Sequence, residues 1–351
     1  MKLLNFITTV FLLVLSIFSF GQDCDVAVLA QRKTSWKFEE THLSPTKDKL
    51  LTKQKAVALA LRKIIVDAYP QPVGCEARWN DSYHDQDTYA EYCNGVFWST
   101  AMFFKFGCGY NNKEIVDDET GTAISISVNS ENLLGAGSVT LNDSVYVARK
   151  VPVGVRDGAF YYQLEPDGLY YNTRGGKFDK VYVFTLPGKQ PYIPMTRKEF
   201  LGLVIQSFKK IQQQVEKSAA EIKDPQWQKT YLSRETYHNT TVIAEFERLL
   251  INLPAADEAK PAIIDMGHGS GLVDENLHFP GFYDTEDPKK ILGCISRENR
   301  NYYDKKLLLT NAQLIAVHIE GYNASSQVLA NVVKEYDQKM DFKAIGALMG
   351  K

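Results

Sequence analysis

The N-terminal segment constrains the fold most, because it is an apolar leader that precedes the part of the chain expected to fold. An apolar run follows the charged Lys2 and ends with small residues, Ser19 and Gly21, three residues and one residue before the expected cut. A charged start, an apolar middle and small residues at the cut are typical of a secretory signal peptide. We therefore expect residues 1–21 to be removed and residues 22–351 to fold in the periplasm or outside the cell.

A lipid anchor on Cys24 is the alternative interpretation of the leader. Acylated bacterial cysteines directly follow small residues, whereas Cys24 follows Gln22 and Asp23. The sequence therefore favours secretion without an anchor. No later apolar stretch approaches the roughly 20 residues that span a bilayer, so we expect no membrane span in the mature chain.

Composition and charge indicate a folded chain without a polyanionic partner. The hydrophobic content of 44% and the charged content of 23% are those of a globular protein. The formal net charge is −2, and no basic patch with interleaved aromatic residues occurs. Both observations argue against nucleic acid as a partner. The length of 351 residues favours more than one domain.

The cysteine pattern predicts a disulfide and no metal site. Cys24, Cys75, Cys93 and Cys108 fall in the first third of the chain, and Cys294 stands apart. In an exported protein we expect at least one disulfide among the first four, with three full connectivities open, and a reduced Cys294. No CxxC pair is present, so we expect no structural zinc. The sequence contains no cofactor signature, so we also expect no cofactor.

Residues 22–190 predict an α+β domain with an antiparallel sheet. Apolar residues recur at three- and four-residue steps over residues 46–69, which predicts an amphipathic helix ended by Pro70 and Pro72. Residues 75–184 then form short β-rich runs separated by turn residues, one of these runs being 138–149. We expect the N-terminal helix to pack on the sheet.

Residues 191–253 predict a long helical hairpin. Thr196 and Glu199 form a capping box, and Asp224 with Pro225 starts a second helix that extends to about residue 251. Four- and three-residue steps in the first helix predict a coiled-coil seam against the second helix. The seam consists of Leu201, Val204, Phe208, Ile211 and Val215.

Residues 254–351 predict a small mixed segment. A strand over residues 313–320 and helices over 325–339 and 342–349 are expected to pack on the hairpin or the sheet. The whole chain is thus expected to be α+β, with an N-terminal helix on an antiparallel sheet, then the long hairpin and this C-terminal segment.

Aromatic residues supply the candidate ligand-binding positions. Tyrosine faces bind sugars and peptides well, because each ring combines apolar area with a hydroxyl. The alternative is ordinary sheet packing, in which adjacent rings lie on opposite faces. The candidates are Trp79, Tyr83, Tyr162, Tyr170 and Tyr171.

No motif for catalysis or metal binding is identified. The cluster Asp81, His84, Asp85 and Asp87 offers oxygen ligands, but it lacks the glycine and the closing glutamate of a helix-loop-helix calcium site. The glycine-rich stretch 267–271 has the wrong register for a nucleophilic serine.

Two cysteine–histidine pairs are conceivable as catalytic pairs. These are Cys93 with His238 and Cys294 with His318. A disulfide for Cys93 and a buried thiol for Cys294 are the favoured interpretations.

The leader end FSFGQ, the segment PYIPMTRKEFL and the C-terminal DFKAIGALMGK resemble uncharacterised exported proteins of the Bacteroidetes type. The resemblance carries no functional motif. The favoured hypothesis is a secreted, non-enzymatic protein whose tyrosine-rich sheet or helical hairpin binds a protein or a glycan. The alternative is a secreted hydrolase that acts on glycan or peptide through Asp81, Asp85 or Asp87.

Overall fold

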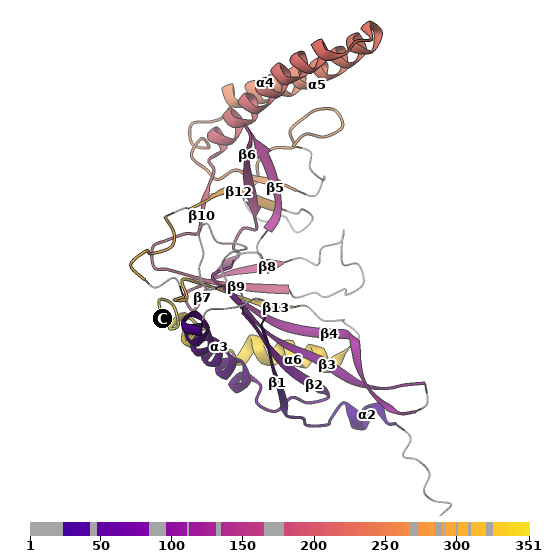
Figure 1. Cartoon of the computed structure of the whole chain (residues 1–351), viewed down its shortest axis with the longest axis vertical. Coiled ribbons are helices and arrows are strands. Elements are labelled where there is room, and N and C mark those ends of the chain that lie inside the picture. Colours follow the sequence, from indigo (N-terminus) through magenta and orange to yellow (C-terminus); the bar gives the residue numbers. More distant parts are fainter. Residues whose placement is uncertain are drawn as a thin grey trace, which may run out of the picture.

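Two β-sheets follow one another along the long axis of the molecule (Figure 1). From one end to the other, the layers are a group of helices, an eight-stranded sheet, a five-stranded sheet and a helical hairpin. In this computed structural model the described residues are 24–42, 48–83, 96–110, 112–130, 135–164, 179–266, 272–284, 290, 292–299, 301–307, 310–320 and 326–351.

The eight-stranded sheet is mixed, and a strand from the C-terminal region lies in its interior. β1 runs parallel to β2, whereas each neighbouring pair from β2 to β7 is antiparallel. β13 pairs with both β4 and β9. In spatial order the strands are β1 (Trp36–His42), β2 (Cys75–Tyr83), β3 (Phe97–Cys108), β4 (Glu114–Val128), β13 (Leu314–Ile319), β9 (Asp179–Thr185), β8 (Ala159–Leu164) and β7 (Gly154–Arg156).

Helices α3 (Asp48–Ala68), α6 (Gln327–Lys339) and α7 (Phe342–Gly346) cover one face of this sheet. Successive strand side chains point to opposite faces. One set, which includes Trp79 and Ile315, packs with Leu61 of α3 and Tyr336 of α6 in an apolar core. The amphipathic helix predicted near residues 46–69 is confirmed by α3.

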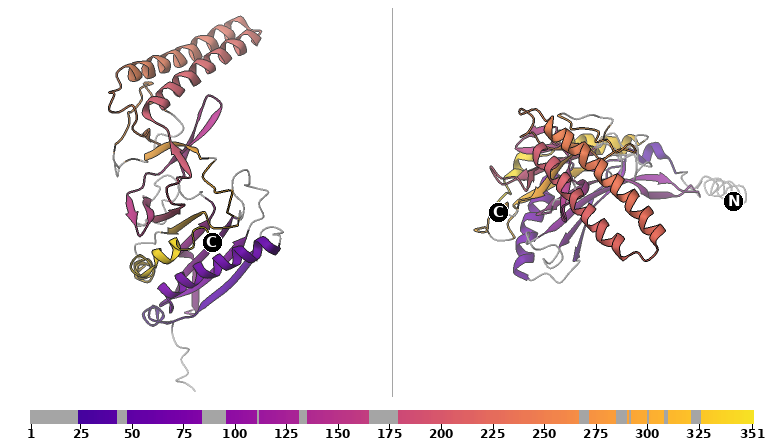
Figure 2. Two further views of the ribbon diagram at one scale, coloured as in Figure 1. Left: turned by 90° about the vertical axis from the view of Figure 1, so that its left-hand side faces the viewer. Right: turned by 90° about the horizontal axis from the view of Figure 1, so that it is seen from above.

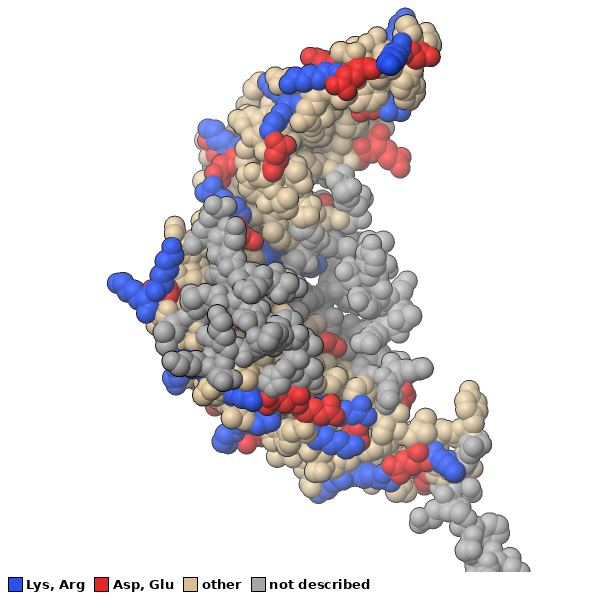
Figure 3. Space-filling model, in the orientation of Figure 1, with Lys and Arg blue, Asp and Glu red and all other residues tan. Residues whose placement is uncertain are grey.

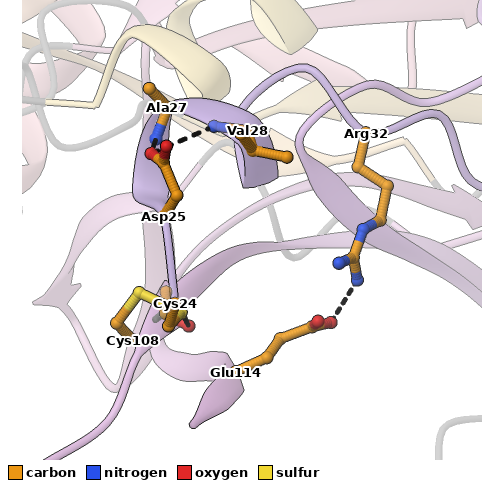
Figure 4. The surroundings of a disulfide bond; sticks show 8 residues. Cys24, Asp25, Ala27, Val28, Arg32, Cys108 and Glu114 are labelled. Atoms are coloured by element: carbon orange, nitrogen blue, oxygen red, sulfur yellow. Dashed lines mark hydrogen bonds and ion pairs between the residues drawn. A yellow bond between two sulfur atoms is a disulfide. The ribbon is translucent and has the colours of Figure 1, made fainter. Parts of the chain in front are cut away.

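A disulfide between Cys24 and Cys108 fixes the start of the described chain to the last residue of β3 (Figure 4). The short helix α2 (Val26–Leu29) follows Cys24 closely. Asp25 caps it by accepting hydrogen bonds from the backbone N–H groups of Ala27 and Val28. The bond therefore ties a four-residue helix, which has little core of its own, to the long β3–β4 pair.

The prediction of a disulfide among the first four cysteines is confirmed by this bond. Cys75 is a free, buried thiol, and burial raises its pKa to about 12. Cys294 is also free, as predicted. Cys93 lies outside the described residues.

We predict that replacing both Cys24 and Cys108 by Ser lowers the free energy of unfolding by about 2–5 kcal/mol, because the bond closes a long loop. The two cysteines are separated by 84 residues in the sequence. Urea midpoints measure the loss. Reductant should lower the midpoint of the wild type and leave that of the double variant unchanged; an effect of equal size on both would contradict the assignment.

The five-stranded sheet combines segments from three separate parts of the chain. Its order is β10 (Tyr192–Pro194), β12 (Leu292–Glu298), β6 (Ser144–Arg149) and β5 (Gly135–Leu141), with β11 (Ile263–Asp265) also paired to β12. The single run predicted over residues 138–149 is wrong, because Asn142 and Asp143 have positive φ angles of 49° and 62° and turn the chain between β5 and β6. Such angles are those of a two-residue hairpin turn, which Asn and Asp tolerate.

The helical hairpin consists of α4 (Arg197–Glu221) and α5 (Pro225–Ile251). Its base packs on this sheet, and the hairpin extends beyond the sheet at one end of the molecule (Figure 2). The predicted capping box is confirmed: the Thr196 hydroxyl accepts from the Glu199 N–H, and the Glu199 carboxylate accepts from the Thr196 N–H. Asp224 caps α5, as predicted.

Only part of the predicted seam is buried. Leu201, Val204 and Val215 are buried, but Phe208 is half-buried and Ile211 is 38% exposed. The buried residues of α5, namely Asn239, Val242 and Phe246, all lie in its second half. The hairpin is therefore anchored at its base, where Phe200 and Phe246 pack with Phe279 and the sheet.

We predict that Phe246→Ala lowers the free energy of unfolding by about 3–5 kcal/mol, because a fully buried ring is lost from this anchor. Lys209→Ala, which breaks an exposed ion pair with Glu247, should cost less than about 1 kcal/mol. Urea midpoints compare the two. Equal midpoints for Phe246→Ala and the wild type would mean that the hairpin base contributes nothing to folding.

The chain is α+β, but the predicted architecture is wrong. The main sheet is mixed rather than antiparallel, and a second sheet is present. The hairpin is a small part of a fold that the two sheets dominate, not its long central element. The C-terminal region does not merely pack on the sheet: it supplies β13 to the interior of one sheet and β11 and β12 to the other. Both sheets therefore draw strands from either side of the boundaries expected at residues 190 and 253.

The chain passes between the two sheets at four connections: β4 to β5, β6 to β7, β9 to β10 and β12 to β13. Among the described helices, none combines the length and the apolarity of a membrane span.

Candidate functional site

A cavity of about 230 Å³ lies between the two sheets, beside the connections that join them. The eight-stranded sheet contributes the face that its helices leave uncovered. Its lining residues come in register from three neighbouring strands, since Phe160 pairs with Val183, and Ala316 pairs with Val183. They are Phe160 and Tyr162 of β8, Val183 and Thr185 of β9, and Leu314 and Ala316 of β13.

The five-stranded sheet supplies the opposite wall. Arg149 and Ile263 both pair with Cys294, so these three side chains share one face. The intervening Ala148 and Ile295 point to the other face and pack in the core beneath the hairpin. The sheet thus presents one face to the hairpin and one to the cavity.

The connecting segments complete the lining. Ser130 follows β4, residues 150–152 follow β6, and Gln190 with Pro191 precedes β10. Pro191 and Pro194 restrict the backbone and donate no hydrogen bond there. Apolar side chains and prolines therefore dominate the cavity walls.

Arg149 and Lys150 bring positive charge to this apolar site. The Arg149 guanidinium carbon lies 3.7 Å from the centroid of the Tyr192 ring. Stacking of this kind holds the planar guanidinium in a defined orientation. Among the described residues that line the cavity, none is a carboxylate.

Tyr162 contributes a neutral hydroxyl. Burial raises its pKa to about 12, the charge of Arg149 opposes that rise, and Cys294 adds to it. The phenol is therefore uncharged at neutral pH and available as a hydrogen-bond donor.

Cys294 contributes a buried thiol. Burial raises its pKa, although Ser296 partly opposes this. The Ser296 hydroxyl donates a hydrogen bond to the backbone carbonyl oxygen of Cys294, at 3.1 Å. Such a thiol is protonated and weakly nucleophilic at neutral pH.

The structure separates the predicted ligand-binding residues. Trp79 and Tyr83 are 0% and 1% exposed in the helix-covered core, so neither offers a surface to a ligand. Tyr162 lines the cavity, while its neighbour Tyr161 points to the helices. The remaining candidates, Tyr170 and Tyr171, lie outside the described residues.

Sequence reasoning missed Arg149, Tyr192 and Cys294 as residues of one site. Arg149 and Tyr192 lie far apart in the sequence and become neighbours only when β6 and β10 flank β12. The sequence signal nearest to the site is the proline-rich segment 187–196, which lies at the boundary expected near residue 190.

Asp81, a candidate for hydrolytic chemistry, lies away from this cavity. It belongs to β2, is 3% exposed and points to the same core as Trp79 and Tyr83. Burial raises its pKa, and the hydrogen bond from the Ser99 hydroxyl opposes that rise. Glu40 also raises this pKa but is itself exposed and paired with Lys55.

The remaining residues considered for catalysis or metal binding in this segment are His84, Asp85 and Asp87, and all three lie outside the described residues. Cys93 does too, so its pairing with His238 is untested. Within the described part of the chain, no three His, Cys, Asp or Glu side chains gather as a metal site.

We predict that Asp81→Asn removes a pH dependence of stability. Because the pKa of Asp81 is higher in the folded than in the unfolded chain, the folded state binds the proton more tightly. The contribution of Asp81 to stability should therefore fall as pH rises from about 3.8 through the raised pKa. Other carboxylates, such as Glu76 and Asp337, have lowered pKa values in the folded chain and act in the opposite direction. The Asp81 contribution is therefore measured as the difference between the urea midpoints of the wild type and of Asp81→Asn, and from pH 3 to pH 7 this difference should shift against the wild type.

Ser99→Ala provides the matched variant. It removes the hydrogen bond that favours the carboxylate, so the decrease should continue to a higher pH than in the wild type. A wild-type midpoint that rises across this range, with Asp81→Asn abolishing the rise, would reverse the assigned direction.

Comparison with protein-family models, curated proteins and solved structures finds no match for this chain. The function is therefore inferred from the geometry of the cavity.

Proposed function

We propose that this protein is a secreted binding protein that holds a small apolar ligand in the cavity between its two sheets. The observation that carries the proposal is the cavity itself, about 230 Å³ in volume and walled mostly by apolar groups. Protein interiors are close-packed, so an apolar space of this size between sheets is unusual. An apolar cavity of about 150 Å³ suffices to bind benzene.

The position of the cavity also supports ligand binding. Small-molecule sites are concave, mostly apolar and often placed between structural units, with a few polar groups that orient the ligand. Here Arg149 and the Tyr162 hydroxyl are such polar groups, and the two sheets are the units.

Binding of a macromolecule has weaker support. Trp79 and Tyr83 are in the core, so the tyrosine-rich sheet does not form the expected aromatic surface. On the hairpin, cationic and anionic side chains are intermixed on the face shown in Figure 3. The exposed Trp227, Tyr237 and Ile251 are spread along α5 rather than gathered at one level.

Export is part of the proposal. The Cys24–Cys108 disulfide is consistent with an oxidising compartment, where such bonds persist. The apolar leader provides the signal for reaching it. Intact mass of the purified protein tests this part: a chain beginning at Gln22 supports it, and retention of residues 1–21 contradicts it.

The binding proposal is tested with 1-octanol, an uncharged probe, in an NMR titration of the full mature protein. We expect saturable shifts in amides of β8, β12 and β13. Val151→Trp, which places a large side chain in the lining, should weaken binding at least about tenfold, because it fills the space that the probe needs.

Val153→Trp is the matched control, because Val153 lies on the same connection but is exposed and outside the lining. It should bind 1-octanol as the wild type does. Urea midpoints verify that both variants fold. The proposal fails if the wild type shows no saturable binding, or if Val151→Trp binds as well as Val153→Trp.

A further inference from the structure

We infer that the ligand is a small apolar carboxylate whose anionic end contacts Arg149. This inference rests on the proposed function, because it assigns the chemical class of the ligand to the same cavity.

The position of Arg149 is the first observation. Its strand neighbour in β12 is Cys294, and both side chains point from the five-stranded sheet toward the cavity. The guanidinium stacks on Tyr192, which belongs to β10 on the other side of β12. A guanidinium held in one plane presents parallel N–H donors that match the two oxygens of a carboxylate. Arg149 is therefore oriented before any ligand enters.

Charge is the second observation. Two cations, Arg149 and Lys150, line the cavity, and no carboxylate occurs among the described lining residues. A positive site in an apolar environment favours an anion, because charges interact more strongly away from bulk water. A cationic ligand would meet like charge from both residues.

The hydroxyl of Tyr162 is the third observation. Tyr162 and Arg149 both line the cavity. A neutral phenol donates a hydrogen bond, and an anionic acceptor strengthens such a bond. Arg149 and Tyr162 reach the cavity from different sheets, so the cavity has a polar group on each of its two walls.

The apolar walls determine the chemistry and the size of the remainder of the ligand. Val151, Phe160, Ile263 and Leu314 surround the space beyond the polar groups. By comparison with the benzene-sized cavity of about 150 Å³, this volume suits a ligand of roughly ten non-hydrogen atoms. Octanoate is therefore a suitable probe, and 1-octanol is its uncharged counterpart of similar length.

The test measures the affinities of octanoate and 1-octanol for the mature protein at pH 8 by calorimetry or NMR. We expect the wild type to bind octanoate at least about tenfold more tightly than 1-octanol. Arg149→Met should lose this preference while it still binds 1-octanol. Arg149→Lys should keep part of the preference, because it retains the charge without the planar fork.

Two further variants test whether the preference for octanoate depends on Arg149 itself rather than on any change of surface charge or folding. Lys209→Met removes an exposed charge on the hairpin and should leave the preference intact. Tyr192→Leu removes the ring that orients the guanidinium and should reduce the preference even where Arg149→Met fails to fold. In the wild type, the preference for octanoate over 1-octanol should also disappear when the pH is lowered enough to protonate octanoate.

The outcomes distinguish this inference from the proposed function. If neither probe binds, the proposed function fails and the inference fails with it. If both bind with equal affinity, the cavity binds apolar ligands but the carboxylate assignment is overturned. If octanoate is preferred and Arg149→Met keeps that preference, Arg149 does not bind the carboxylate and the inference is overturned.

Discussion

The fold depends on the placement of β13 inside the eight-stranded sheet. Without this strand, β1 to β4 and β7 to β9 would form two separate sheets. Its start is fixed by Asn129, a buried residue after β4, whose side-chain oxygen accepts hydrogen bonds from the N–H groups of Gln313 (2.8 Å) and Leu314 (3.2 Å). Ile315 and Val317 then pack beneath the helices, while Leu314 and Ala316 face the other way. A strand buried on both faces contributes much of the apolar burial that offsets chain entropy.

This placement also explains the cavity. The chain must leave the eight-stranded sheet to build the five-stranded sheet, and must then return to insert β13. Residues of three of the connections, namely Ser130, 150–152, and Gln190 with Pro191, line the space between the sheets together with side chains of β8, β9, β13, β6 and β12. Because several of the connecting residues are prolines, this backbone is restricted and has fewer donors to satisfy. The space between the sheets thus follows from the topology, and Arg149 gives it a polar end.

Burial also determines the roles of the cysteines. Cys24 and Cys108 lie near the chain start and a strand end, where they can meet and form a disulfide. Cys75 and Cys294 lie in apolar surroundings that disfavour the thiolate, so the pKa of each is raised. A protonated, enclosed thiol is a poor nucleophile and reacts slowly with oxidants. Cys75 and Cys294 therefore serve as apolar packing groups, in the core and at the cavity wall respectively.

Local features could be predicted from the sequence alone. The cap at Thr196, the start of α5 at Pro225, the amphipathic α3 and the presence of a disulfide depend on neighbouring residues or on composition, and the structure confirms them. The leader remains a prediction from its residues. The sequence of a strand does not show which element packs on each face of its sheet. Alternation shows that Trp79 and Tyr83 share a face, but it does not show that helices from both ends of the chain cover that face. Likewise, Arg149, Tyr192 and Cys294 meet only because three distant strands pair. The tertiary structure decided the core and the candidate site, because strand pairing and layer packing join segments whose sequences carry no signal of each other.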